Sequence, residues 1–149
     1  MMDKNITLES IQNAIKAHEA EMARIEDAIL GNYVEDPVST GKTQCPFGRW
    51  IYNENNHLKE ILGAQFYNTI DEQHTKWHSE YLVIYNILFK NQKKQGFLSK
   101  MMKIKSIDGM ELDKVKAYYA DLQITTSELL KILGASERRV EAMSESRFK

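Results

Sequence analysis

The main structural element is predicted by residues 64–93, which read AQFYNTIDEQHTKWHSEYLVIYNILFKNQK. Apolar and aromatic side chains recur in this stretch at steps of three and four residues, which is the spacing of one face of an α-helix. The sequence therefore predicts a long helix with one buried face, beginning at about Leu58 or Ala64 and ending at about Lys93. The residues on that face are Phe66, Ile70, His74, Trp77, Tyr81, Ile84 and Leu88.

A second helix is predicted near the N-terminus. Thr7 is a residue type that favours the N-cap position, and Gly31 followed by Asn32 favours a left-handed helix stop. The apolar face of this helix includes His18, whereas Glu21 falls on the side expected to face solvent. That apolar face consists of Ile11, Ile15, His18, Met22, Ile25 and Ile29.

The remaining elements are a turn-rich loop, a short helix and a last long helix. Residues 32–44 show no helical period and lead to Cys45, and Pro46 is suited to the first position of a short helix. Residues 110–146 carry an apolar face close to a heptad repeat. Because we find no alternating strand pattern, we expect an all-α protein, an antiparallel four-helix bundle with an additional short helix after the cysteine loop. We expect one domain over residues 1–149, with the motif-bearing part at about 7–93 and a C-terminal helix at about 110–146.

Composition excludes several classes of protein. The chain has 42% hydrophobic and 28% charged residues, as ordinary globular proteins do. Twenty Lys and Arg against 21 Asp and Glu give a net charge of −1, so we expect neither a nucleic acid nor a membrane as a partner. No apolar run is long enough to span a bilayer, and the N-terminus has no signal-peptide pattern, so we expect a cytoplasmic protein. The one cysteine excludes an internal disulfide.

Four side chains together predict a metal site. His74 and His78 are one helical turn apart and can converge on one ion, although a pair on a half-buried surface would have the same spacing. His18 lies on a buried face, where its ring nitrogens need partners, either a metal or ordinary hydrogen-bond acceptors. Cys45 could be a small buried hydrophobe, or it could supply a thiolate. Three imidazoles and one thiolate make a complete tetrahedral set for Zn²⁺.

The same residues carry a resemblance to a known family. An inward-facing histidine in the first helix, the stretch CPFGRWIY at 45–52 and the stretch DEQHTKWH at 71–78 resemble the bacterial chemoreceptor zinc-binding domain, a small four-helix bundle. The resemblance extends from the first helix to Leu88. It implies that the zinc ligands are His18, Cys45, His74 and His78. The remaining histidine, His57, has no counterpart among these ligands, and we expect it in a loop or on the surface.

A closed site with four protein ligands leaves no position for substrate, so we expect a zinc-binding sensory or regulatory protein and not an enzyme. The site would sense zinc, or an oxidant that attacks Cys45, and would signal to a partner protein. The resemblance implies a role in bacterial chemotaxis or cyclic-di-GMP signalling. The near-heptad last helix favours a homodimer. Two alternatives stay open at this point: a metal-dependent hydrolase or lyase with an open zinc position, and a purely structural zinc bundle.

Overall fold

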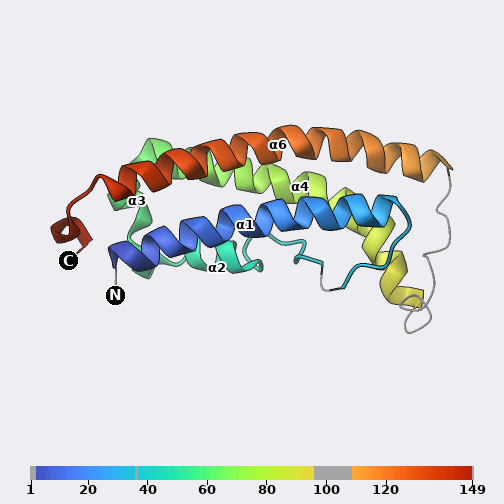
Figure 1. Cartoon of the computed structure of the whole chain (residues 1–149), viewed down its shortest axis with the longest axis horizontal. Helices are drawn as coiled ribbons and strands as arrows, with labels where there is room; N and C mark the ends of the chain where they lie inside the picture. The colour runs from blue at the N-terminus through green and yellow to red at the C-terminus, as the bar shows by residue number, and fades with distance from the viewer. Residues whose placement is uncertain (1–2, 36, 96–108, 149) are drawn as a thin grey trace.

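Three long helices make up most of the computed structural model, which describes residues 3–35, 37–95 and 109–148. These helices are α1 (Lys4–Ile29), α4 (Ala64–Gln95) and α6 (Gly109–Glu141). In Figure 1, α6 lies along both α1 and α4 and runs in the opposite direction to them. The described residues contain no strand, so the predicted all-α class is confirmed. None of their helices combines the length and the apolar character needed to cross a bilayer.

Short helices occupy the segment between α1 and α4. This segment runs back along α1 and contains α2 (Pro46–Ile51), the 3₁₀ helix η1 (Glu54–Asn56) and α3 (Leu58–Leu62) (Figure 1). The short helix predicted after Cys45 is confirmed as α2. The two starts predicted for the long helix are the first residues of two separate helices, since α3 begins at Leu58 and α4 begins at Ala64. Gly63, with φ of +91°, separates the two helices.

The first helix begins earlier than the sequence analysis predicts. The side chain of Asp3 accepts hydrogen bonds from the backbone N–H groups of Asn5 and Ile6, at 2.7 and 3.1 Å, and therefore caps α1. The hydroxyl of Thr7 donates to the carbonyl of Asp3 at 2.9 Å, so Thr7 lies in the first turn and is not the N-cap. The predicted stop is confirmed, since Gly31 adopts φ of +92° directly after the helix.

The two ends of the described chain lie close together (Figure 1). The Lys4 ammonium at the start of α1 donates to the carbonyls of Glu141 and Met143, at 3.0 and 2.7 Å. Glu141 is the last residue of α6 and Met143 lies two residues beyond it, so the ammonium binds carbonyls at and just after the C-terminal end of that helix. The C-terminal helix predicted at about 110–146 ends earlier, at Glu141, and the chain continues into η2 (Glu145–Phe148), where Phe148 is buried.

Glu21 is fully buried, so its predicted place on the solvent-facing side of α1 is wrong. Its Oε1 atom accepts hydrogen bonds from the Val38 backbone N–H at 3.1 Å and from the Arg24 guanidinium at 3.0 Å. Its Oε2 atom has no partner among the described residues. Burial raises the pKa of Glu21, and the bonds from Val38 and Arg24 offset part of that shift. The loop after α1 folds back over this side of the helix, which the spacing within α1 alone does not indicate.

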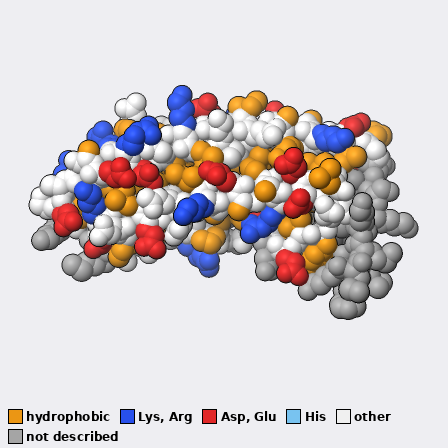
Figure 2. Space-filling view, viewed as in Figure 1, with side chains coloured by type: hydrophobic (Ala, Val, Ile, Leu, Met, Phe, Trp, Pro, Cys, Tyr) orange, Lys and Arg blue, Asp and Glu red, His pale blue; other side chains and the backbone are white. Residues whose placement is uncertain are grey.

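Charged side chains of both signs are interspersed over the face of the molecule shown in Figure 2. This pattern matches the balanced composition of 20 basic and 21 acidic residues.

We expect Glu21→Gln to gain stability relative to wild type as the pH rises from 4.5 to 8. A carboxyl group with a raised native pKa contributes stability that is present below its unfolded pKa of 4.5 and is lost as the pH rises through the native pKa. The glutamine amide still offers an oxygen to Val38 without a buried charge. Urea unfolding of both proteins at the two pH values, followed by circular dichroism, measures the difference. An equal difference at both pH values would contradict the expectation.

Candidate metal centre

Three histidines meet in the interior of the protein. His18 comes from α1, and His74 and His78 come from successive turns of α4. All three side chains are buried, with at most 4% of their surface exposed. One ring nitrogen of each residue lies within 4.8 Å of the corresponding nitrogens of the other two. The structure therefore brings together the three histidines that the sequence analysis selects.

Backbone carbonyls orient two of the imidazoles. Nδ1 of His18 lies 2.7 Å from the carbonyl oxygen of Ala14, and Nδ1 of His78 lies 3.0 Å from that of Thr40. A carbonyl can only accept, so the proton of each neutral ring is on Nδ1 and the lone pair is on Nε2. Nε2 of His78 is buried and has no partner among the described residues. A metal ion would satisfy this orphaned lone pair, which supports a metal at this position.

Cys45 lies next to the histidines at the start of α2. Its sulfur atom is 3.4 Å from Nε2 of His74, accepts the backbone N–H of Gly48 at 3.2 Å and donates to the carbonyl of Lys42 at 3.5 Å. Burial raises the pKa of the Cys45 thiol, and the hydrogen bond from Gly48 opposes that shift. The thiol is therefore protonated at neutral pH without a cation, and a bound cation would displace the proton.

Gly48 allows the cysteine segment to reach the site. A Cβ atom at this position would lie 1.6 Å from the carbonyl oxygen of Lys42, far inside any real contact. The first turn of α2 thus packs directly on the loop backbone.

Aromatic rings enclose the centre. The Trp77 ring contacts His18 and His78 edge-on, at centroid distances of 4.8 and 5.0 Å, and the Phe47 ring lies 5.0 Å from that of His74. Trp77 is fully buried, and its indole N–H donates to the hydroxyl of Thr126 in α6 at 2.8 Å. The packing role predicted for Trp77 is confirmed, and the rings keep the histidines in a low-dielectric environment.

Burial keeps the histidines neutral. It lowers the pKa of His74 to about 2, with smaller contributions from the neighbouring His78 and His18. It also lowers the pKa of His78 to about 4, and it lowers the pKa of His18 against the opposing bond to Ala14. Neutral imidazole is the form that binds a metal, so the protein holds these side chains in the required state at physiological pH.

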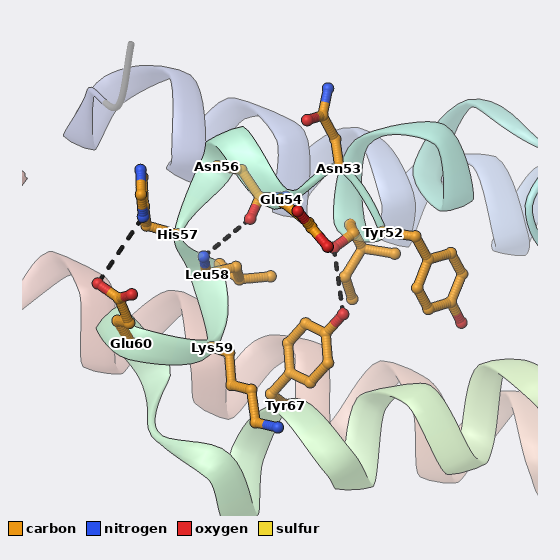
Figure 3. Close-up of a pocket in the computed structure, with 10 residues that line it drawn as sticks. Tyr52, Asn53, Glu54, Asn56, His57, Leu58, Lys59, Glu60 and Tyr67 are labelled. Atoms are coloured by element: carbon orange, nitrogen blue, oxygen red, sulfur yellow. Dashed lines mark hydrogen bonds and ion pairs between the residues drawn. The ribbon is translucent and has the colours of Figure 1, made fainter.

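The fourth histidine lies elsewhere. His57 links η1 to α3 with φ of +50°, is exposed, and has its Nδ1 3.7 Å from a carboxylate oxygen of Glu60. It lines a pocket together with Tyr67 (Figure 3). It does not belong to the histidine group, so its predicted place on the surface is confirmed.

The sequence analysis missed the polar groups that contact the histidines from outside. Thr40 supplies only its backbone carbonyl, which has no sequence signal. The Tyr52 hydroxyl contacts Nδ1 of His74 and donates a hydrogen bond to the carboxylate of Asp71. The one available signal was that Asp71 lies three residues before His74, on the same side of the helix.

The fold and the site define an all-helical protein with a buried centre of three histidines and an adjacent cysteine. Residues 18–82 match the family model described as the chemoreceptor zinc-binding domain. The match begins at His18 and includes Cys45, His74 and His78. It confirms the predicted resemblance and supports membership of this family, and zinc is the metal for which the cluster is positioned. Comparison with curated proteins and with solved structures gave no match.

We expect Gly48→Ala to destabilise the protein by about 1–3 kcal/mol and to weaken zinc binding, because the added methyl group forces Cys45 and the Lys42 loop apart. Urea unfolding and competition with a zinc chelator measure the two effects. The matched control is Gly134→Ala in α6, where a Cβ atom meets only the Arg138 side chain at 3.6 Å. The control should retain zinc affinity and gain up to about 1 kcal/mol. Unchanged stability and zinc affinity in Gly48→Ala would contradict the close approach.

Proposed function

We propose that the protein is a zinc-binding sensory or regulatory protein in which His18, Cys45, His74 and His78 are the four ligands of one Zn²⁺ ion. The observation that carries this proposal is the convergence of three neutral imidazoles, of which His78 has a buried and unpartnered Nε2. The sulfur next to His74 completes a set of donors that tetrahedral zinc prefers. In this proposal the segment with α2 and α3 takes the fourth position of an antiparallel four-helix bundle.

The donor set favours regulation over catalysis. Four protein ligands fill the coordination sphere of zinc and leave no position for water or substrate, whereas hydrolytic zinc sites keep one position open. The matched family is a sensory family and not an enzyme family. We therefore propose that the protein acts in the cytoplasm by changing conformation and not by turning over a substrate.

The ligands come from three segments that are distant in the sequence. When bound, zinc would supply a four-coordinate cross-link between α1, the Cys45 segment and α4. Without it, the loop before Cys45 is held to α4 by weaker contacts, which include Thr40 to His78 and the Tyr81 hydroxyl to the Val38 carbonyl at 2.7 Å. We propose that loss of zinc weakens the hold of the Cys45 segment on the bundle, so that the segment opens more often, and that a signalling partner detects this opening, in chemotaxis or cyclic-di-GMP signalling.

Oxidation of Cys45 would give a second input. The thiolate would attack hypochlorous acid, forming a sulfenic acid with chloride as the other product, and a sulfenic acid is a weaker zinc ligand. Because only 3% of the Cys45 surface is exposed, an oxidant reaches the sulfur when the segment opens. Zinc loss and oxidation would therefore promote each other.

We also propose that the protein is a homodimer that associates through α6. The support is the near-heptad apolar pattern of this helix, on which Ile124 is 64% exposed. Ile124→Glu should then shift the molar mass measured by light scattering from that of a dimer to that of a monomer. A dimer mass for the variant would contradict association through this face.

Alanine substitution of each proposed ligand tests the site. Each of His18→Ala, Cys45→Ala, His74→Ala and His78→Ala should weaken zinc binding by at least about 10-fold, since even residues that only orient ligands have effects of that size. His57→Ala is the matched control and should bind one equivalent with wild-type affinity. Elemental analysis and chelator competition provide the measurement. Full zinc affinity in any of the four variants would remove that residue from the ligand set.

The Co²⁺-substituted protein separates the proposal from the alternatives. A visible spectrum of tetrahedral cobalt with one thiolate supports the closed site. A spectrum that indicates a water ligand, together with turnover of a simple ester, would support a hydrolase. A purely structural role would instead appear as complete unfolding on zinc removal, seen in the far-UV circular dichroism.

A further inference from the structure

One of the three imidazoles faces a hydroxyl group and not a carbonyl. The Tyr52 hydroxyl, at the end of α2, lies between the Nδ1 atom of His74 at 3.2 Å and a carboxylate oxygen of Asp71 at 2.7 Å. Both Asp71 and His74 belong to α4 and are separated by less than one turn. The hydroxyl thus connects a carboxylate to a ring that contacts the cysteine sulfur with its other nitrogen.

This difference matters because a hydroxyl can either donate or accept. The carbonyls of Ala14 and Thr40 leave His18 and His78 with only one possible neutral tautomer, with the proton on Nδ1. A tyrosine alone could donate its proton to Nδ1 of His74 and place the ring proton on Nε2, where it would block a metal. Only His74 therefore needs a further group to fix the direction of its hydrogen bond.

Asp71 fixes the direction of the hydrogen bond between Tyr52 and His74. An ionised carboxylate has no proton to donate, so the single hydroxyl proton of Tyr52 is in the short bond to Asp71. The tyrosine oxygen is then free only to accept, and His74 must donate its Nδ1 proton to it. The lone pair of His74 is consequently on Nε2, the atom that lies 3.4 Å from the Cys45 sulfur.

Lys42 holds the carboxylate in place. Its ammonium lies 3.2 Å from the Asp71 oxygen and 2.8 Å from the hydroxyl of Thr75, and it is 5.1 Å from the centre of the Tyr52 ring. The backbone carbonyl of Lys42 also accepts a hydrogen bond from the Cys45 thiol. The same lysine residue therefore contacts both the cysteine and the carboxylate side of the centre.

We propose that Tyr52 and Asp71 are a positioning pair that fixes the tautomer of His74 and presents its Nε2 atom to the metal. This inference rests on the proposed function, because it takes His74 as a zinc ligand. Tyr52 and Asp71 touch no metal themselves and act only through His74.

The first test is Tyr52→Phe, which removes the acceptor for Nδ1 and keeps the ring. Zinc affinity, measured by chelator competition, should fall about 10- to 100-fold, as for other groups that orient metal ligands. In the zinc-free protein, long-range ¹H–¹⁵N NMR spectra should show His74 changing from a pure Nδ1–H tautomer to a mixture. A purely structural role for Tyr52 would not change this tautomer.

Tyr67→Phe is the matched control. The Tyr67 hydroxyl points toward the backbone of Ile51 at 3.4 Å, whereas the Tyr52 ring points away from that pocket (Figure 3). The control loses a tyrosine hydroxyl from the same region without touching His74, so zinc affinity should change by less than about twofold and the His74 tautomer should be unaltered.

Asp71→Ala gives an independent test that does not alter the tyrosine. It frees the Tyr52 proton to turn toward His74, so the NMR spectra should show more Nε2–H tautomer, and zinc affinity should fall. The double variant should be no weaker in zinc binding than the worse single variant, because the two residues act through one bond. Additive losses in the double variant would contradict the pair.

The inference and the proposed function fail in different ways. If His74→Ala loses zinc while Tyr52→Phe and Asp71→Ala keep wild-type affinity and tautomer, the positioning pair is wrong and the ligand set stands. If His74→Ala keeps its zinc, the ligand set is wrong and the pair falls with it. If Tyr52→Phe does not fold, Asp71→Ala decides the question by the same two measurements.

Discussion

Three imidazoles buried in one space are the constraint on which the rest of this structure depends. Each ring is buried away from solvent, and this burial lowers its pKa. Each ring is therefore neutral and carries one nitrogen-bound proton and one nitrogen lone pair. The proton of each ring has an oxygen partner on the outside of the cluster. The lone pairs are left facing a common interior, where Nε2 of His78 has no partner in the described part of the chain. Such an interior is unfavourable unless a cation occupies it, which explains why a zinc-binding family and this geometry coincide.

The surrounding elements position this cluster. The Glu21 carboxyl group and the Tyr81 hydroxyl both bind the Val38 backbone, and these contacts bring the loop back across the bundle to Thr40 and on to Cys45. Trp77 connects the other side of the cluster to Thr126 in α6. The centre is therefore joined to the first helix, the return segment and the last helix, and a change at the metal can reach each of them through direct contacts.

The helices and their buried faces could be predicted from the sequence, because they depend on helical periodicity. Helical spacing predicts the three long helices and places His18 and His74 on buried faces, with His78 one turn from His74, because one face of a helix must be apolar to pack. It does not predict groups that depend on chain segments crossing over one another. Glu21 is buried by a distant loop, Thr40 contributes a backbone atom, and the role of Tyr52 depends on Asp71 from another element. The start of α1 was misplaced for a local reason, since Asp3 and Thr7 are both good caps and only the structure shows which side chain binds the free N–H groups.

X-ray absorption at the zinc K-edge of the purified protein is the most direct test of the central claim. The account predicts one ion with a single sulfur neighbour at about 2.3 Å and three nitrogen neighbours at about 2.0–2.1 Å. The imidazole pattern of outer-shell scattering should accompany the three nitrogens. A first shell without sulfur, or one that includes a water oxygen in place of an imidazole, would contradict a closed centre made by His18, Cys45, His74 and His78.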